Sequence, residues 1–198
     1  FPENEEEIRE ILLALRKNKV PVTIQGGKTG ITGAAVPKGG HIMNLSHMNQ
    51  VKDSVLLEDR TGRITVEAGI NRIELKREIA ARFRKSPLFW PPDPTESSAT
   101  VGGIAATNAQ GINRLLYGDS KKYIEALKFI DSEGKTVTVT KGQTLLLPSG
   151  REIEEMDAVL GKEGITGVVT ELTLKLIPKP ESVWGIAFFF NGQEDAGR

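Results

Sequence analysis

Apolar residues recur at two spacings along the chain, one typical of helices and the other of strands. Two stretches have the helical spacing, and each begins at an asparagine, Asn4 or Asn71, with a glutamate three residues later, which is the pattern of a capping box. Strands are predicted over residues 20–24, 41–45, 51–58, 63–68, 123–131, 136–140 and 168–177. A loop over 145–149, a third helix over 152–160 and a last strand over 183–190 complete the pattern. This mixture of helices and antiparallel hairpins predicts an α+β fold.

Two sets of polar positions refine this picture. In the strand over residues 63–68, Glu67 alternates with Val66 and Ala68, which predicts that one face of the strand meets water. The third predicted helix carries three glutamates that are expected to form a solvated face and no catalytic pair: Glu152, Glu154 and Glu155.

A glycine-rich stretch over residues 25–37 follows the first predicted strand. Its glycines let the backbone take positive φ angles, and successive N–H groups in such a loop form a nest for an anion. Thr29 and Thr32 add hydroxyl donors and Lys28 adds a positive charge, so a ligand with phosphate groups is expected. A P-loop is excluded because Val22 stands where it needs a glycine, and the dinucleotide fingerprint is excluded because Pro37 follows instead of a helix. A plain surface turn remains the alternative.

Small side chains dominate residues 96–111, directly after a proline-rich stretch, residues 90–95, that cannot form a regular element. Small side chains allow the close approach of another helix or of a flat ligand. Two interpretations therefore remain, a tightly packed helix or the wall of a ligand site, and the wall is favoured. After the glycine-rich stretch and the small-residue stretch, a third stretch of this kind is the glycine-rich loop over residues 161–167, which precedes the strand over residues 168–177.

The composition limits the classes of function. The 198 residues include 26 basic and 26 acidic side chains, which argues against a nucleic-acid surface or a polybasic membrane patch. The absence of cysteine excludes disulfides and thiolate chemistry, and the presence of only two histidines, His41 and His47, argues against a histidine-rich metal site. No apolar run reaches the roughly 20 residues of a membrane-spanning helix. Because the chain starts with Phe1 in a helical pattern, we expect sequence to be missing at one or both ends.

Four stretches in order resemble the signatures of the FAD-binding domain of the PCMH type, also called the vanillyl-alcohol oxidase type. They are residues 25–37, residues 92–109, the pair Tyr117-Gly118, and residues 161–174. Within that family the chain is most similar to the FAD-linked dehydrogenases of 2-hydroxy acids, such as D-lactate dehydrogenase and the flavin subunit of glycolate oxidase. The runs over residues 29–33 and 91–94 carry this likeness.

The resemblance implies two α+β subdomains with FAD between them, over residues 1–66 and 67–180, and the start of a missing substrate (cap) domain over residues 181–198. The backbone of residues 26–30 would hold the pyrophosphate, the segment around Thr100 would approach the flavin, and the segment around Ile165 would face the adenine. The implied cofactor-binding residues are Gly26, Gly27, Lys28, Thr29, Gly30, Ile31, Gly33, Ala34, Pro92, Asp93, Thr100, Gly102, Gly103, Ala105, Thr107, Asn108, Gly111, Gly118, Glu163, Gly164, Ile165, Val168 and Val169.

The resemblance also implies a reaction: a small 2-hydroxy acid, of the D-lactate or glycolate type, is oxidised by hydride transfer to the flavin. The electrons then pass to an acceptor protein or a quinone. Non-covalent FAD is expected, because Lys28 and Thr29 stand where some members carry a flavin-linked histidine. No catalytic base can be assigned. We expect no nucleic-acid partner, no transmembrane segment and a location in the cytoplasm or at the inner face of the membrane.

Three other functions remain open from the sequence. One is a non-catalytic flavin module that transfers electrons within a multisubunit complex. Another is a nucleotide-sugar enolpyruvyl reductase that uses NADPH, for which the chain shows no strong counterpart of the serine proton donor. The third is a structural or protein-binding domain, which is disfavoured because ordering three glycine-rich loops without a ligand costs conformational entropy.

Overall fold

Asparagine side chains cap the N-termini of the two longest helices. The computed structural model describes residues 1–147, 149–190 and 192–196. Helix α1, Glu5–Lys17, starts at Asn4, whose Oδ1 accepts a hydrogen bond of 3.0 Å from the Glu7 backbone N–H. Helix α2, Arg72–Arg82, starts at Asn71 with a complete capping box, because the Glu74 carboxylate also accepts from the Asn71 backbone N–H. Both predicted helix starts are confirmed.

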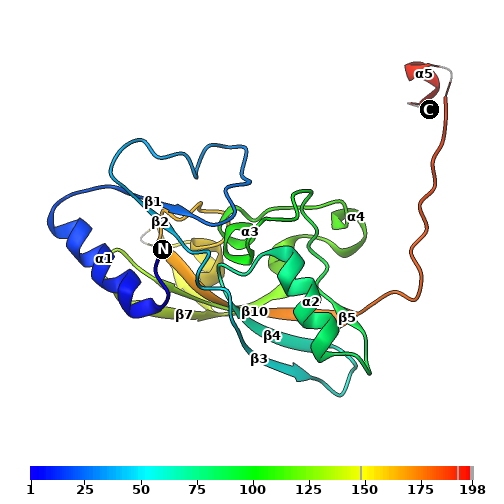
Figure 1. Ribbon diagram of the computed structural model, residues 1–198, viewed down its shortest axis with the longest axis horizontal. Helices are drawn as coiled ribbons and strands as arrows, with labels where there is room; N and C mark the ends of the chain where they lie inside the picture. The colour runs from blue at the N-terminus through cyan, green and yellow to red at the C-terminus, as the bar shows by residue number, and fades with distance from the viewer. Residues whose placement is uncertain (148, 191, 197–198) are drawn as a thin grey trace.

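A small parallel sheet follows α1. It consists of β1, Val22–Gln25, and β2, His41–Asn44, which pair in register from Val22 with His41 to Gln25 with Asn44. The connection between these two strands is the glycine-rich stretch, which lies above both sheets in Figure 1. The two predicted strands thus place this stretch at the end of a short sheet.

The main sheet is antiparallel and has the strand order β3-β4-β10-β6-β7. The strands are β3, Val51–Leu56, β4, Gly62–Glu67, β6, Ile124–Ile130, β7, Thr136–Thr140, and β10, Val168–Pro178, with the short strand β5, Leu88–Phe89, paired to the end of β10. Strand β10 is the centre of this sheet, and its Leu172, Leu174 and Leu176 are fully buried. All of these strands were predicted within a few residues except β5, for which no element was predicted.

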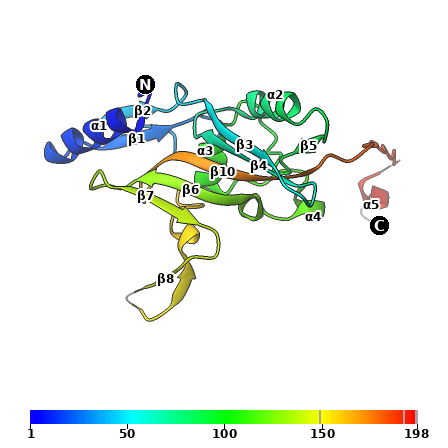
Figure 2. The ribbon, with the colours of Figure 1, turned by 90° about the horizontal axis from the view of Figure 1, so that it is seen from below.

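The remaining elements connect and cover the main sheet. They are α3, Val101–Thr107, α4, Arg114–Tyr117, the 3-10 turns η1, Ser120–Tyr123, and η2, Glu155–Ala158, the hairpin of β8, Thr144–Leu146, with β9, Glu152–Glu154, and α5, Gln193–Ala196. Figure 2 shows the β8 hairpin projecting away from the main sheet. Figure 1 shows α3 beneath the glycine-rich stretch, on the same side of the molecule.

The helix predicted over residues 152–160 is wrong. Residues 152–154 form β9 because Ile153 pairs with Leu145, and the helical turn that follows is only four residues long. The three glutamates therefore do not share a solvated helix face. Glu154 receives hydrogen bonds from the Lys121 ammonium and the Gly142 N–H, which lower its pKa below the usual range. The predicted loop over 145–149 is right in part: residues 145 and 146 belong to β8, residues 147 and 149 lie in the turn between β8 and β9, and residue 148 lies outside the described residues.

One expectation about exposure is right only in part, and one about a strand is wrong. The face of β4 that carries Glu67 is exposed at Arg63, but Glu67 itself is only 5% exposed and forms an ion pair with Lys52. The strand predicted over residues 183–190 has no ladder partner among the described residues, and its apolar side chains, such as Trp184 and Phe189, are exposed. An apolar run alone does not make a strand, because a strand needs a neighbour for its backbone groups. Figure 1 shows this segment extending away from the sheets.

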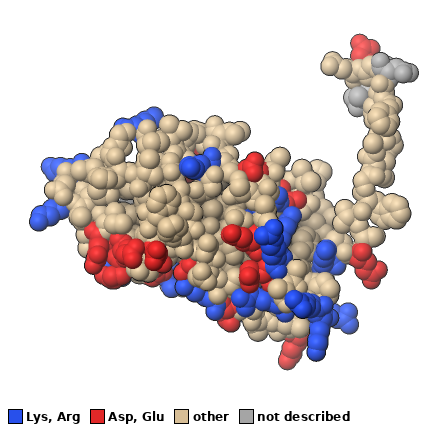
Figure 3. Space-filling model, in the orientation of Figure 1, with Lys and Arg blue, Asp and Glu red and all other residues tan. Residues whose placement is uncertain are grey.

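Charged side chains are unevenly distributed over the surface. In Figure 3 the face that carries the glycine-rich stretch is mostly uncharged, with small groups of basic side chains, whereas acidic and basic side chains are interspersed along the lower edge. Among the described residues, no helix combines the length and the apolar character needed to cross a bilayer.

Candidate functional site

Three chain segments enclose a cavity of about 530 Å³ between the small parallel sheet and α3. The first segment is the loop that follows β1, the second is residues 94–110 with α3 inside it, and the third is the loop that precedes β10. Ala68, at the end of β4, and Val169, near the start of β10, form part of the wall. Most of the lining side chains are small, so the cavity is shaped largely by backbone.

The loop after β1 is held open by side chains from the parallel sheet. Gln25 Nε2 donates a hydrogen bond of 2.8 Å to the Ala35 carbonyl, and Asn44 Nδ2 donates one of 3.3 Å to the Gly26 carbonyl. None of the backbone N–H groups of residues 26–33 donates a hydrogen bond to another described residue. A run of unpaired N–H groups beside a cavity is suited to an anion that accepts several hydrogen bonds.

The first two glycines of this loop lie directly against the second segment. A Cβ atom at Gly26 would lie closer than 3.0 Å to the Thr100 hydroxyl oxygen, and one at Gly27 would lie closer than 3.0 Å to the Ser98 carbonyl oxygen. Only glycine permits this approach without moving the loop. The contact fixes how far the first loop stands from α3.

Helix α3 satisfies both interpretations of the small-residue segment. It is a packed helix, because a Cβ atom at Gly102 would lie 2.6 Å from the Ala68 Cβ, and the Gly102 N–H donates to the Ala68 carbonyl at 2.8 Å. It also forms a cavity wall through Gly102, Gly103 and Thr107. Thr100 caps its start by accepting a hydrogen bond from the Gly103 N–H.

The third glycine-rich loop docks on the end of α3. The Gly161 N–H donates to the Ala105 carbonyl at 3.2 Å, and the Glu163 N–H donates to the Ala106 carbonyl at 2.7 Å. Across the cavity mouth, the Thr32 hydroxyl donates a hydrogen bond of 3.0 Å to Glu163 Oε1. The first and third loops are thus joined directly by the Thr32–Glu163 hydrogen bond, and the third loop is also attached to α3.

Left-handed backbone conformations concentrate around this cavity. Five described residues other than glycine have a positive φ, and three of them, Lys28, Asn108 and Glu163, lie one on each of the three segments. A non-glycine residue in this conformation costs about 1 kcal/mol. Such strain is concentrated at functional sites in proteins, so its distribution here indicates a binding site.

The charged groups of the lining are Lys28, Glu96 and Glu163. Hydrogen bonds from the Ser98 N–H and hydroxyl lower the pKa of Glu96 below its usual range, with a smaller contribution from the charge of Arg72. Burial lowers the pKa of the Arg72 guanidinium, which forms an ion pair with Asp93. The Asp93 carboxylate is therefore held in this ion pair, and Asp93 does not line the cavity.

The structure brings 14 of the 23 residues implied by the resemblance to the lining of this cavity. They are Gly26, Gly27, Lys28, Thr29, Gly30, Ile31, Ala34, Thr100, Gly102, Gly103, Thr107, Glu163, Gly164 and Val169. The other nine lie outside the lining: Gly33, Pro92, Asp93, Ala105, Asn108, Gly111, Gly118, Ile165 and Val168.

Another set of lining residues is absent from the implied binding residues. Most of them lie in the stretches that were expected to contact the ligand, and Thr32 had been named there as a hydroxyl donor. Ala68 had no such signal, because residues 63–68 were interpreted only as a strand with one face in water. The lining residues outside the implied set are Ile24, Thr32, Ala35, Leu45, Ala68, Pro94, Thr95, Glu96, Ala99, Ile104, Ala106, Ala109, Gln110 and Gly167.

A sequence model of the FAD binding domain family matches residues 1–140. The D-lactate dehydrogenase of Anaerostipes hadrus is 34% identical to this chain over 195 residues, which cover 96% of the chain and 38% of that protein. The D-lactate dehydrogenase of Archaeoglobus fulgidus is 33% identical, over 98% of the chain and 42% of that protein. The glycolate oxidase subunit GlcD of Bacillus subtilis is 30% identical, over 91% of the chain and 37% of that protein.

These relatives are much longer than the matched region, so the chain spans about two fifths of their length. Among solved structures, alkyldihydroxyacetonephosphate synthase superimposes with a TM-score of 0.71 over 91% of this chain and 34% of that protein. The sequence identity is 24%, so this likeness shows a shared fold.

Proposed function

We propose a function from one premise: this chain belongs to the FAD binding domain family, whose model it matches over residues 1–140. The family and the α+β fold class predicted from the sequence are confirmed, and FAD is the cofactor that the family binds. The observation that carries the proposal is the cavity bordered by unpaired N–H groups on one side and small side chains on the other. FAD has the matching chemistry, an anionic pyrophosphate and a flat, largely apolar ring system.

The residues present fit this cofactor. The N–H groups of residues 26–30 would hold the pyrophosphate, and Lys28 adds a positive charge at the same place. Gly102 and Gly103 line the cavity and would lie against the flavin ring. Bound there, the flavin supplies a two-electron acceptor, and the protein sets its position and electrostatic surroundings. The 23 residues implied by the resemblance stay a proposal for the full set of FAD contacts. Attachment of FAD through non-covalent contacts alone is part of the same proposal.

The two-subdomain division implied by the resemblance also stays a proposal. The parallel pair β1 and β2 would belong to the first subdomain and the main sheet to the second. The membership of β3 and β4 in the main sheet supports a boundary between residues 44 and 51, earlier than residue 66. Residues 181–198 would lead into a substrate domain.

We propose further that the whole protein oxidises a small 2-hydroxy acid. The support is the likeness to proteins named D-lactate dehydrogenase and glycolate oxidase subunit. The proton acceptor for the hydroxyl group would come from residues outside this chain, and the electrons would pass to an acceptor protein or a quinone. A quinone acceptor would place the protein at the inner face of the membrane, and a protein acceptor would allow a cytoplasmic location.

A chimera tests this assignment. The region of the Archaeoglobus fulgidus D-lactate dehydrogenase that matches this chain is replaced by the chain, and the rest of that protein is kept. With FAD bound and oxygen removed, D-lactate is expected to bleach the visible flavin absorption of the chimera, whereas the chain alone with FAD keeps its colour. A chimera that holds FAD but is bleached by no 2-hydroxy acid contradicts the proposal, and bleaching by NADPH instead would favour the reductase alternative.

A further inference from the structure

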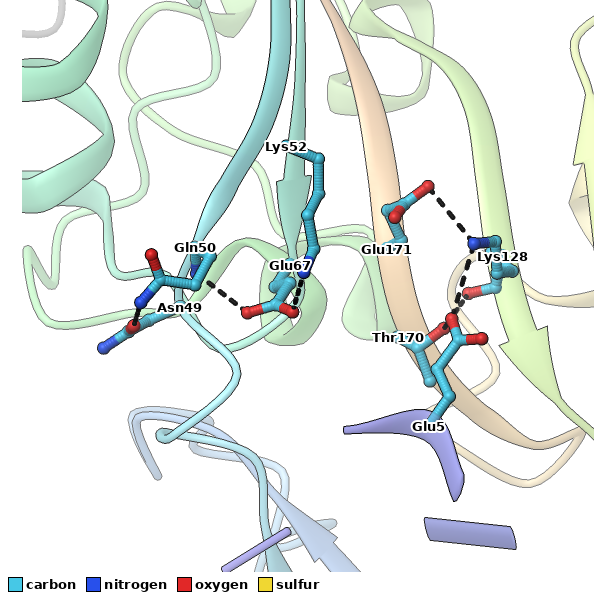
Figure 4. A network of polar contacts seen from close by, with 8 residues as sticks. All are labelled: Glu5, Asn49, Gln50, Lys52, Glu67, Lys128, Thr170 and Glu171. Carbon is cyan, nitrogen blue, oxygen red and sulfur yellow. Dashed lines mark hydrogen bonds and ion pairs between the residues drawn. The ribbon is translucent and has the colours of Figure 1, made fainter. Parts of the chain in front are cut away.

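A network of polar side chains lies behind the wall of the FAD cavity, and Figure 4 shows its members. Six of them line a second, separate cavity of about 250 Å³: Glu5, Lys52, Glu67, Lys128, Thr170 and Glu171. They come from α1 and from the four strands β3, β4, β6 and β10. Successive side chains of a strand point to opposite faces. Accordingly, Glu67 and Thr170 face the network, whereas their neighbours Ala68 and Val169 line the FAD cavity.

Two β-bulges place side chains in this network. In the pairing of β3 with β4, Lys52 is the extra residue between Val51 and Asp53. In the pairing of β10 with β6, Thr170 is the extra residue between Val169 and Glu171. The second bulge explains why the consecutive residues Thr170 and Glu171 line the same cavity. Bulges next to functional sites re-aim side chains in this way.

One contact of α1 with the main sheet passes through Thr170, and Arg9 makes another by donating hydrogen bonds to the Gly134 carbonyl and the Thr136 hydroxyl. The Thr170 side chain is fully buried, and its hydroxyl donates a hydrogen bond of 2.7 Å to Glu5 Oε1. Lys128 Nζ lies 3.6 Å from the Glu5 carboxylate and 3.5 Å from that of Glu171. A hydrogen bond to a carboxylate is stronger than one between neutral groups, so it can fix the start of α1 on the sheet.

A short chain of backbone hydrogen bonds continues from Thr170 to the FAD cavity. The Ala68 N–H donates to the Thr170 carbonyl at 2.9 Å, and the Gly102 N–H of α3 donates to the Ala68 carbonyl at 2.8 Å. On the other side, α1 runs directly into β1 and the glycine-rich loop. The Glu5–Thr170 contact therefore joins the element that carries the first loop to the strands that carry α3.

We propose that Glu5 and Thr170 are positioning residues that set the spacing between the glycine-rich loop and α3, and thereby the affinity for FAD. This inference rests on the proposed FAD site, and neither side chain lines the cavity of that site. If the contact is lost, α1 and the first loop gain freedom relative to α3, and FAD binding must restore the spacing at a cost in affinity.

The test compares four variants of the chain with the wild type. Thr170→Val removes the hydroxyl at nearly constant volume, Thr170→Ser keeps it, and Glu5→Gln removes the charge at a partly exposed position, so that a folded variant is available. Arg16→Ala is the matched control, because Arg16 ties the far end of α1 to the Ser132 carbonyl and not to the cavity wall. FAD titrations give Kd, and hydrogen exchange without FAD reports on the amides of Ala68 and Gly102.

Thr170→Val is expected to raise Kd about tenfold, the equivalent of losing one hydrogen bond to a charged group. Glu5→Gln keeps an acceptor oxygen and loses only the charge, so it is expected to raise Kd by a smaller factor. In Thr170→Val the amides of Ala68 and Gly102 are expected to exchange faster, whereas Thr170→Ser and Arg16→Ala keep Kd and exchange close to the wild type. The proposal would be overturned if Thr170→Val left the Kd for FAD unchanged. It would also be overturned if Thr170→Ser or Arg16→Ala raised that Kd as much as Thr170→Val does. If the wild type binds no FAD, the proposed function fails, and the exchange of the two amides still decides the positioning role.

Discussion

Replacing Gly27 by alanine is expected to raise the Kd for FAD about a hundredfold, because an added Cβ in a tightly packed position forces a backbone shift that costs 1–3 kcal/mol. The new atom would lie closer than 3.0 Å to the Ser98 carbonyl oxygen, which is backbone and cannot turn away. The loop must then move away from α3, and its N–H groups leave the positions that would hold the pyrophosphate. Titration of the chain with FAD, followed by flavin fluorescence, measures the change.

The matched control is Gly185→Ala, because no atom lies within 4 Å of the Cβ that it would add. It is expected to keep the wild-type Kd. A Gly27→Ala chain that is folded and binds FAD as tightly as the control would contradict the close contact between the first loop and the second segment.

Replacing Lys28 by glycine is expected to change stability and affinity in opposite directions. Lys28 has a φ of 59°, so glycine relieves backbone strain and should raise the free energy of unfolding of the FAD-free chain by about 0.5 kcal/mol, after allowance for the greater freedom of glycine in the unfolded state. The same change removes a positive charge from the phosphate site and is expected to raise Kd for FAD about tenfold. Denaturant unfolding and FAD titration measure the two effects.

Two comparisons isolate the charge. Arg60→Gly changes another residue with positive φ, at 63°, which lies in the turn between β3 and β4 and does not line the FAD cavity. It should stabilise the chain similarly and leave Kd unchanged. Riboflavin, which lacks the pyrophosphate, should bind Lys28→Gly and the wild type equally, and the difference for FAD should shrink in high salt because the site is exposed. If Lys28→Gly weakens riboflavin as much as FAD, the lysine does not act through the phosphates.

Local patterns in the sequence predicted most of the elements, because capping and alternation are properties of neighbouring residues. Asn71 with Glu74 fixed the start of α2, and the glycine-rich loops were located from composition alone. The prediction failed where a pattern was ambiguous over a short run: residues 152–154 alternate as a strand does, but their glutamates favoured the helix interpretation.

The arrangement of the strands could not be predicted from local pattern. That β10 lies between β4 and β6 depends on pairing across more than a hundred residues. The burial of Glu67 follows from this arrangement, because α1 and the neighbouring strands bring Lys52 and other polar groups over that face. Bulges are also invisible locally, since they are properties of two strands together. The candidate site was therefore predicted through its loops, whereas its wall at Ala68 and the network behind it were not.

The most direct test of the central claim is the visible absorption spectrum of the purified chain after FAD has been added and the excess removed by gel filtration. The FAD site described above predicts a yellow protein with about one flavin per chain, and acid precipitation should release all of the colour into solution. A chain that is folded by circular dichroism but retains no flavin contradicts the assignment of the cavity. Colour that stays with the precipitated chain contradicts the non-covalent attachment.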